Sequence, residues 1–313
     1  MRIPWIEIHG GLGNQLFQWF YAHTIAENQN FRVHLSFPPS EKSEELVYRL
    51  TDLEANCSHC YNGGNESKSN KKYSTLFRFY NRVFHLSCLR SHLNKFGYSK
   101  ELWDIRENPG FSFIGGKKKK FVSGFFQNQQ ILDRVKKDIK HELVPVIESL
   151  AEEVLAKLNL KPKNYSIAHI RKYPFSYGER ISIGNLGKGY YESWANSHKH
   201  ETLLLLCKLN SDAEFVRDIF PKSIVLTNEI IGPWETLALM SFAKELLSSN
   251  STLSWWGAFL CFQNGGLPYL PDNWSCWGNI DIRCLQFEGS RTWQTEWDFS
   301  THIDWTLLPL ESR

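Results

Sequence analysis

The hydrophobic and polar positions near the N-terminus predict a strand, a glycine turn and a helix. Residues 3–9 form a short apolar-rich run that ends at Gly10-Gly-Leu-Gly-Asn-Gln15, and a helical pattern follows from about Leu16 to Ala26. A second apolar run at 31–37, closed by two prolines, predicts another strand. A strand that enters a helix through a glycine turn is typical of the first unit of a nucleotide-binding α/β fold.

Apolar runs and helical patterns alternate through the rest of the chain. Strands are expected at 121–126, 166–171, 202–207, 223–227 and 246–248, and helices at 129–143, 145–158, 212–219, 234–243 and 254–262. This alternation predicts parallel sheets with helices on both faces, and hence an α/β fold. The two halves, 1–160 and 161–313, predict two Rossmann-type lobes with a cleft between them. An irregular insertion at about 40–120 interrupts the first lobe.

The composition is that of a globular protein and excludes wholesale disorder. Charged residues make up 22% and hydrophobic residues 42% of 313 positions, and the net charge of +3 suits anionic small molecules without indicating nucleic acid. Cys57 and Cys60 have the spacing of metal ligands, but no second such pair accompanies them, so we favour a loop over a zinc site. No apolar run reaches the ~18 residues of a membrane span and no signal peptide is visible, so we expect a cytoplasmic protein.

The glycine turn at residues 10–15 is the first of three strand-to-helix turns that suit a phosphate. Gly11 and Gly13 let the backbone approach a ligand, and the helix that follows offers free N–H groups to an anion. The turn is not the dinucleotide fingerprint, because Leu16 occupies the place of its last glycine. An ordinary tight turn remains the alternative interpretation.

The second turn follows the expected strand 166–171. His169 and Arg171 share one face of that strand, and Lys172 adds a second cation at the carboxyl edge, where α/β sheets bind ligands. The donors of an arginine suit a pyrophosphate and would stabilise the charge that grows on a departing nucleoside diphosphate. The alternative is a surface ion pair at the end of a strand.

The third turn joins the short strand 246–248 to a helix. Asn250, Ser251 and Thr252 either cap that helix or hold a phosphate at its N-terminus. The phosphate-loop lysine motif, the zinc-protease motif and a paired-aspartate metal grip are all absent from the sequence. We therefore expect arginine, lysine and backbone N–H groups to meet the diphosphate charge, with no obligatory metal and no cofactor.

Four segments together resemble the α-1,2-fucosyltransferase family, glycosyltransferase family 11. They are Gly10-Gly-Leu-Gly-Asn-Gln-Leu-Phe-Gln18, Gly124-Phe-Phe-Gln127, His169-Ile-Arg171 and Asn250-Ser-Thr-Leu-Ser-Trp-Trp-Gly-Ala258. They occur in the family's order from position 10 to about position 275. The resemblance implies a GT-B-like fold, GDP-fucose as donor, and inversion at the fucose carbon by one in-line displacement without a metal.

The resemblance also implies roles for individual residues. Arg171 would bind the pyrophosphate and act as the main catalytic residue, and His169 would lie near the guanine and ribose. The further donor-binding residues expected are Gly11, Gly13, Asn14, Gln15, Lys172, Asp212, Asn250, Ser251 and Thr252. Asn14 would lie near the phosphate and fucose, and Ser251 and Thr252 on the β-phosphate. Asp212 would contact the guanine or the ribose.

The segment after Arg171 departs from the family's pattern. Lys172 replaces a second arginine, which keeps the charge but loses the bidentate geometry, and the acidic residue that usually follows is missing. Glu179 is a candidate to take over an orienting or general-base role, with a plain loop carboxylate as the alternative.

The sequence thus predicts an α-1,2-fucosyltransferase that moves fucose from GDP-fucose to the 2-hydroxyl of a galactoside acceptor. One alternative is a degenerate relative that binds nucleotide sugar or glycan without transfer, and another is a transferase that uses a different GDP-sugar. The insertion at 40–120 carries no readable acceptor code.

Overall fold

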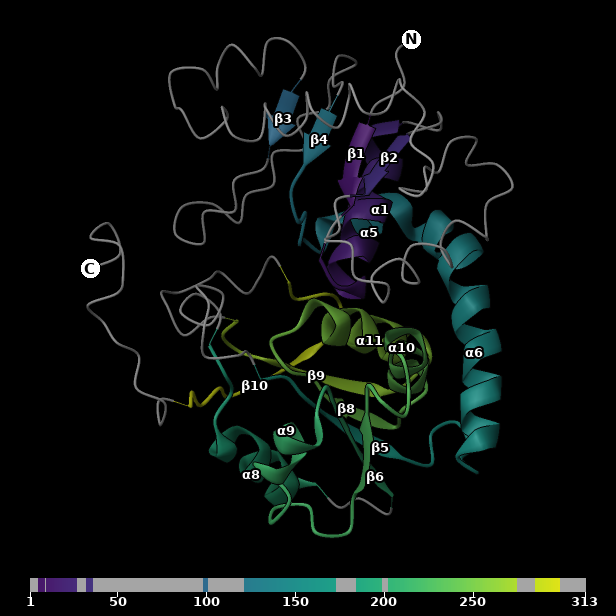
Figure 1. Ribbon diagram of the computed structural model, residues 1–313. Helices are drawn as coiled ribbons and strands as arrows, with labels where there is room; N and C mark the ends of the chain where they lie inside the picture. Colours follow the sequence, from purple (N-terminus) through teal and green to yellow (C-terminus); the bar gives the residue numbers. More distant parts are fainter. Residues whose placement is uncertain are drawn as a thin grey trace, which may run out of the picture. The chain divides into compact units, whose positions relative to one another are not determined.

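The computed structural model describes residues 5–8, 10–26, 32–35, 98–100, 121–172, 184–198, 202–274 and 285–298 (Figure 1). The chain divides into two compact units, Met1–Glu148 and Ser149–Arg313. The sequence placed the division between residues 160 and 161, after a long helix. In the structure the boundary along the chain falls inside that helix. Three expectations stay predictions: that the first lobe binds the acceptor, that the second lobe binds GDP-fucose, and that a cleft lies between them.

The first unit contains a four-stranded parallel sheet. Its strands are β1 (Trp5–Ile8), β2 (Arg32–Leu35), β3 (Tyr98–Lys100) and β4 (Phe121–Ser123), in the order β2-β1-β4-β3. The strands predicted at 3–9, 31–37 and 121–126 are therefore confirmed with shorter bounds. Of the predicted insertion, the structure describes the residues of β3.

Helix α1 (Leu12–Ala26) begins inside the predicted glycine turn, earlier than the sequence pattern suggested. Leu12, Leu16 and Trp19 are all almost fully buried and are spaced as one face of a helix. Leu12 therefore belongs to the apolar stripe that was predicted to start at Leu16. As a result Gly13 lies in the first helical turn and not in the loop before it.

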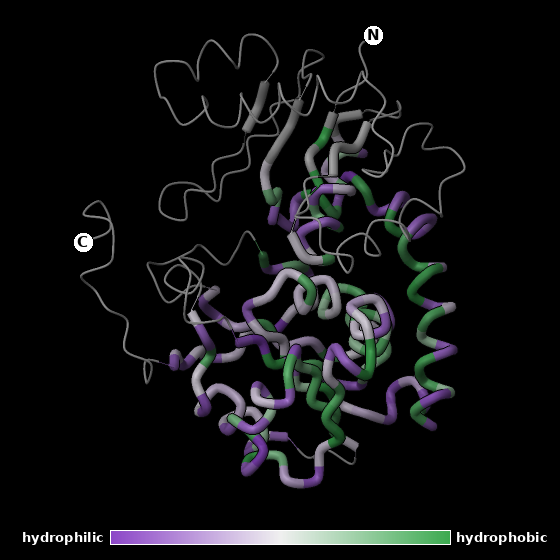
Figure 2. The backbone as a smooth tube through the Cα atoms, viewed as in Figure 1, coloured by the Kyte–Doolittle hydropathy of each residue, from purple (hydrophilic) through white to green (hydrophobic). Residues whose placement is uncertain are grey.

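Three consecutive helical segments come after β4: α5 (Gln130–Asp138), which is kinked at Val135, the π-helix η1 (Ile139–Leu143) and α6 (Val144–Lys157). The sequence predicted two helices here, with a start near Pro145. A proline inside a helix normally removes a hydrogen bond and clashes with the preceding turn. Here that preceding turn is the wider π-helix, which fits a helix that runs on through Pro145. Along α6, hydrophobic and hydrophilic residues alternate with helical spacing (Figure 2).

The second unit contains a six-stranded parallel sheet in the order β10-β9-β8-β5-β6-β7. Its strands are β5 (Ser166–Ile170), β6 (Leu203–Cys207), β7 (Ile224–Thr227), β8 (Glu245–Leu247), β9 (Leu267–Pro271) and β10 (Arg291–Trp293). Every residue of β5 and β6 is buried, as expected of parallel strands covered on both faces. The parallel α/β fold predicted from the sequence is confirmed.

Helices cover both faces of this sheet (Figure 1). They are α8 (Lys188–Ser197), α9 (Asn210–Glu214), α10 (Pro233–Ser241) and α11 (Thr252–Gln263). The α8 side chains Tyr190 and Trp194 share a buried core with Ala168 of β5. On the opposite face the hydroxyl of Tyr165 donates to the carbonyl of Leu239 in α10 at 2.8 Å.

Two predicted helix bounds in the second unit need correction. Helix α9 ends at Glu214, and turns replace the helix that was expected as far as Ile219. Helix α11 begins at Thr252, earlier than expected, so the polar run before it is shorter. Among the residues described, no helix combines the length and the apolarity that a membrane span requires.

Candidate functional site

In each sheet, the described strands include two neighbours whose connections leave toward opposite sides of the sheet, which is called a topological switch point. In the first unit this switch lies between β1 and β4, and in the second it lies between β5 and β8. Open parallel α/β sheets bind ligands in the crevice at the carboxyl ends of such strand pairs. Three of the segments that carried the sequence prediction come after β1, β4 and β8, and the fourth, His169-Ile-Arg171, spans the end of β5.

In the first unit, the segment after β4 lies against helix α1, which follows β1. The side chain of Gln127 donates to the side-chain oxygen of Asn14 at 2.9 Å, and Gln18 donates to the carbonyl of Gly124 at 3.0 Å. The rings of Tyr21 and Phe126 stack with centroids 3.9 Å apart. These contacts bring together two segments that lie more than a hundred residues apart in the sequence.

The glycine turn itself is shaped by close packing around Asn14. Gly10 has φ +80°, and a Cβ atom there would lie 2.8 Å from the side-chain nitrogen of Asn14. The positive φ favours glycine at this position, and a larger residue would also push the side chain of Asn14 aside. Gly11 is exposed and has open space around it, and the side chain of Gln15 is buried and donates back to the carbonyl of Gly10 at 2.7 Å. Gln15 therefore holds the turn, and its predicted role toward a donor stays a prediction.

In the second unit, a side-chain hydrogen bond joins the carboxyl ends of β5 and β8. Nδ1 of His169 lies 2.7 Å from the hydroxyl oxygen of Ser249, and both side chains are buried. The strands are direct neighbours, with Ala168 paired to Leu247. Ser249 was part of the polar run seen in the sequence, but nothing in that run distinguished it from the other serines.

His169 is held in its neutral form. Burial, and secondarily the charge of Arg171, lower its pKa from the usual 6.5 to about 3. A histidine with so low a pKa does not take up a proton near neutral pH, so it is unsuited to be a general base. It is suited to form hydrogen bonds in one fixed tautomer.

The two cations after β5 have different surroundings. Arg171 comes directly after the last residue of the strand and is half-buried. The ammonium of Lys172 lies 2.9 Å from a carboxylate oxygen of Asp298 and 3.2 Å from the centre of the Phe215 ring. The positive charge of Lys172 is therefore already paired within the second unit.

The polar residues before helix α11 are arranged around its N-terminus. Asn250 is buried and donates from its side chain to the carbonyl of Gly184 at 3.1 Å. Ser251 occupies the position that normally caps the helix, but its side chain makes no capping hydrogen bond. Thr252 is the first helical residue. A hydroxyl at an N-terminus that it does not itself cap is well placed to meet an anion there.

Asp212 lies in α9, which follows the carboxyl end of β6. Its carboxylate is buried and accepts the backbone N–H of Leu209 at 3.1 Å, so it stabilises the start of this short helix. A contact to guanine or ribose stays a prediction. Glu179, and the pair Cys57 and Cys60, lie outside the described residues.

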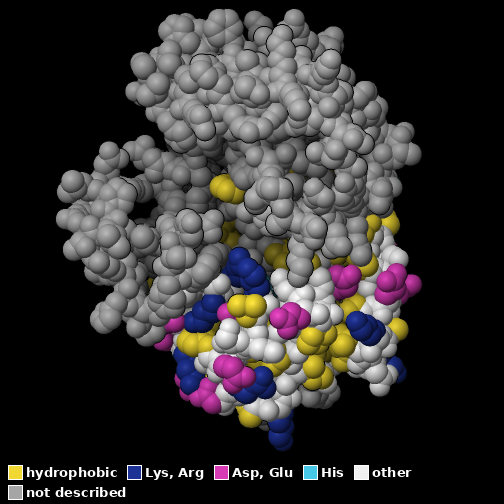
Figure 3. Space-filling model, viewed as in Figure 1, with side chains coloured by type: hydrophobic (Ala, Val, Ile, Leu, Met, Phe, Trp, Pro, Cys, Tyr) yellow, Lys and Arg dark blue, Asp and Glu magenta, His cyan; other side chains and the backbone are white. Residues whose placement is uncertain are grey.

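Charges of both signs are mixed on the one face of the second unit that Figure 3 shows. Figure 3 shows lysine and arginine side chains interspersed with aspartate and glutamate on the face drawn. This agrees with the small net charge and with a small-molecule ligand, since a nucleic-acid site would need a basic stripe.

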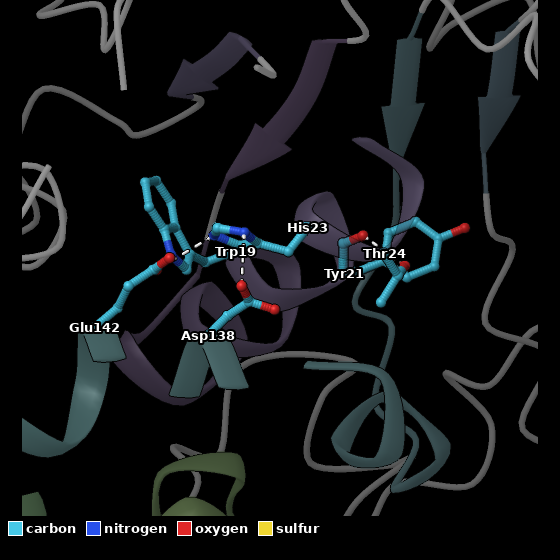
Figure 4. A network of polar contacts seen from close by, with 6 residues as sticks. All are labelled: Trp19, Tyr21, His23, Thr24, Asp138 and Glu142. Atoms are coloured by element: carbon cyan, nitrogen blue, oxygen red, sulfur yellow. Dashed lines mark hydrogen bonds and ion pairs between the residues drawn. The ribbon is translucent and has the colours of Figure 1, made fainter. Parts of the chain in front are cut away.

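A second polar cluster in the first unit includes residues from the later part of α1 (Figure 4). His23 of α1 has Nε2 3.2 Å from Glu142 and Nδ1 3.8 Å from Asp138, and Glu142 also accepts the indole N–H of Trp19 at 2.8 Å. One ligand atom from each of these three titratable residues lies within 4.8 Å of the others. Because the two ring nitrogens face different carboxylates, the cluster has the geometry of ion pairs that tie α1 to the helical segment 130–143.

The chain matches no protein-family model. It is 26% identical over 297 residues to the α-1,2-colitosyltransferase of Escherichia coli, a match that spans 88% of this chain and 93% of that protein. Solved structures with a similar course of the chain include the fucosyltransferase NodZ from Bradyrhizobium (9% identity, TM-score 0.47, 83% of this chain and 94% of that one). A glycosyltransferase of family 9 from Veillonella parvula is another (10% identity, TM-score 0.44, 94% and 85%). The full-length relative is a glycosyltransferase, and this is the class of protein that the sequence predicts.

Proposed function

We propose that the chain is an inverting glycosyltransferase that moves L-fucose from GDP-fucose to the 2-hydroxyl of a galactose-containing glycan. The observation that carries the proposal is the hydrogen bond between His169 and Ser249, since it joins the ends of β5 and β8 beside Arg171. An α-1,2-linking relative over most of the chain supports the same class of reaction.

The proposed reaction is a single displacement at the anomeric carbon of the donor. The acceptor O2 forms a bond to C1 of the sugar while the bond from C1 to the β-phosphate oxygen breaks, and its electron pair stays on GDP. The proton of the acceptor hydroxyl passes to a base, for which Glu179 is the candidate from the sequence. Arg171 and the N-terminus of α11 would stabilise the charge that grows on the leaving diphosphate. In this scheme His169 remains neutral and serves as a hydrogen-bonding partner.

A second candidate donor is GDP-colitose, which the name of the Escherichia coli relative favours. Colitose is fucose without its 3-hydroxyl, so a pocket that hydrogen-bonds that hydroxyl would reject colitose strongly. A pocket that is apolar there would accept both sugars. The ratio of kcat/KM for the two donors therefore identifies the natural one.

The test incubates the protein with each GDP-sugar and with lactose, N-acetyllactosamine or the type 1 disaccharide, and determines the product linkage. We expect release of GDP and a new α-1,2 bond, with turnover retained in a chelator because no metal is required. Arg171→Ala should lower kcat about 100- to 1,000-fold, since it removes a group that acts on the transition state. Arg217→Ala is the matched control, because Arg217 is an exposed arginine of the same unit paired with Glu214.

The outcomes separate three cases. Turnover that falls with Arg171→Ala but not with Arg217→Ala supports the proposal. Calorimetry that finds GDP binding by a wild type without transfer or donor hydrolysis would favour a degenerate binding protein. Absence of both binding and turnover with every donor and acceptor would contradict the proposed function.

A further inference from the structure

Lys172 lies between two partners that come from distant parts of the second unit. Its ammonium is 2.9 Å from a carboxylate oxygen of Asp298, and the two side chains are only 18% and 13% exposed. On its other side the ring of Phe215, at the end of α9, lies 3.2 Å away. A lysine with a carboxylate and an aromatic face as partners is fixed in position.

Asp298 belongs to a segment that we call the C-terminal strap, residues 285–298, which includes β10. The strap is fastened along its whole length. Near its start the indole N–H of Trp255 in α11 donates to the carbonyl of Leu285 at 2.6 Å. After β10 the N–H of Thr295 donates to the side chain of Asp272, which follows β9, at 2.8 Å.

The end of the strap lies beside residues 184–187. The N–H of Asp298 donates to the carbonyl of Asn185 at 2.8 Å, and Leu186 forms an antiparallel bridge with Trp297. The N–H of Gly187 donates to the carbonyl of Glu296 at 2.6 Å. A Cβ atom on Gly187 would lie 3.2 Å from that same carbonyl oxygen, which fits the choice of glycine at this close approach.

Asp298 is linked, directly or through one other residue, to three parts of the second unit that carry or adjoin candidate donor-binding residues. Its carboxylate holds the residue next to Arg171, and its backbone holds the stretch whose Gly184 carbonyl accepts Asn250. Lys172 in turn contacts α9, the helix of Asp212. One aspartate from the strap therefore connects the end of β5, the stretch 184–187 and α9.

We propose that Asp298 is a positioning residue of the donor site, which fixes Lys172 and thereby the backbone that presents Arg171. Lys172 then holds the backbone at the end of β5 in place. Its charge is neutralised by Asp298 and is not available to bind the diphosphate. Asp298 thus supplies, from the strap, the carboxylate that the sequence lacks directly after Arg171. This inference rests on the proposed function, because it concerns the same site.

The test is a double-mutant cycle with Asp298→Asn, Lys172→Met and the double variant. Asp298→Asn keeps the size of the side chain, and Lys172→Met keeps its length while removing the charge. We expect each single change to lower kcat about ten- to a hundredfold, because a small displacement of a catalytic group is costly. The double variant should be no worse than either single one, since both changes break the same link. Lys172→Arg should retain most of the turnover.

The matched control is Asp218→Asn. Asp218 is paired with Lys188 in the same unit, but this pair is exposed, so its loss should leave kcat and the Kd of GDP unchanged. GDP affinity, measured by calorimetry, distinguishes a structural role of Lys172 from a direct contact between Lys172 and GDP. A positioning role predicts that Lys172→Met and Asp298→Asn change the Kd of GDP by the same factor. A direct contact of Lys172 with the diphosphate predicts a large rise in Kd for Lys172→Met alone.

Three results would overturn the inference. They are turnover of Asp298→Asn equal to that of Asp218→Asn, additive losses in the double variant, or loss of GDP affinity confined to the Lys172 variant. The melting temperatures of the four proteins test the link itself without any assay of activity, since removing both partners should cost no more than removing one. A wild type that neither binds GDP nor transfers sugar would refute the proposed function, while the melting cycle would still decide whether Lys172 and Asp298 act as a pair.

Discussion

The neutral state of His169 predicts how the stability of the second unit depends on pH. In the folded protein its pKa is about 3, because burial and then the charge of Arg171 disfavour the imidazolium, whereas in the unfolded chain it returns to about 6.5. Below pH 6.5 the unfolded state binds a proton that the folded state does not. His169 therefore contributes stability that is complete above about pH 6.5 and is lost as the pH falls toward 3.

The magnitude follows from the two pKa values. The full difference between 6.5 and about 3 corresponds to roughly 5 kcal/mol and is an upper limit reached only in strong acid. Between pH 7 and pH 5 the loss from this one residue is about 2 kcal/mol. That free energy raises the population of the opened state about 25-fold.

Hydrogen exchange measures this loss in the second unit alone. Wild type is compared with His169→Gln, which retains an amide that reaches toward Ser249 but does not titrate. After correction for the intrinsic rates, amides of β5 and β6 in the wild type should open about 25-fold more often at pH 5 than at pH 7, relative to the variant. Peptides from the first unit are the internal control and should respond equally in both proteins. Identical pH dependence of β5 and β6 in wild type and variant would refute the assignment of a buried neutral histidine.

Two further predictions concern packing and the cluster in the first unit. Gly257→Ala would place a Cβ atom 2.7 Å from the Cβ of Met240, so we expect a loss of roughly 1–3 kcal/mol, seen as a lower melting temperature and faster exchange in α11; an unchanged melting temperature would contradict this packing. Glu142→Gln removes the carboxylate charge that faces His23 but keeps an acceptor for Trp19, so we expect it to be the milder of two changes at this residue. Glu142→Leu also orphans the buried indole N–H and should cost roughly 1–3 kcal/mol more, measured by exchange in α1; equal losses for the two variants would show that this hydrogen bond contributes nothing.

Strand β6 of the second unit was predictable because its sequence is a continuous apolar run, whereas β9 and β10 were not among the predicted strands. Residues 203–207 consist of four leucines and a cysteine, and such a run fits a strand buried on both faces. The start of α1 was harder to predict, because Gly11 and Gly13 read as loop residues. The start of the helix at Leu12 goes with the burial of that side chain, and burial depends on tertiary packing that the local sequence does not show.

The sequence indicated several residues of the candidate site, but it did not indicate the hydrogen bonds and ion pairs between them. Arg171 and Asn250 come after strand ends and His169 lies within the last two residues of β5, and the position of a strand end can be read from hydrophobicity. The partners that hold them cannot be read in this way. Asp298 lies 126 residues beyond Lys172, and Ser249 is one of several serines in a polar run. No local pattern encodes a contact over such a separation, because side-chain pairing is decided by the order of strands in the sheet.

The distance in sequence between Lys172 and Asp298 also orders events during synthesis of the chain. The strands β5 to β9 are complete at Pro271, so five of the six strands of the second sheet can assemble before the strap has been translated. The residues beside Arg171 acquire their carboxylate partner only after residue 298 has been added. A nascent chain can therefore form most of this sheet before Lys172 gains its carboxylate partner, so the local structure beside Arg171 is completed later than the sheet that carries it.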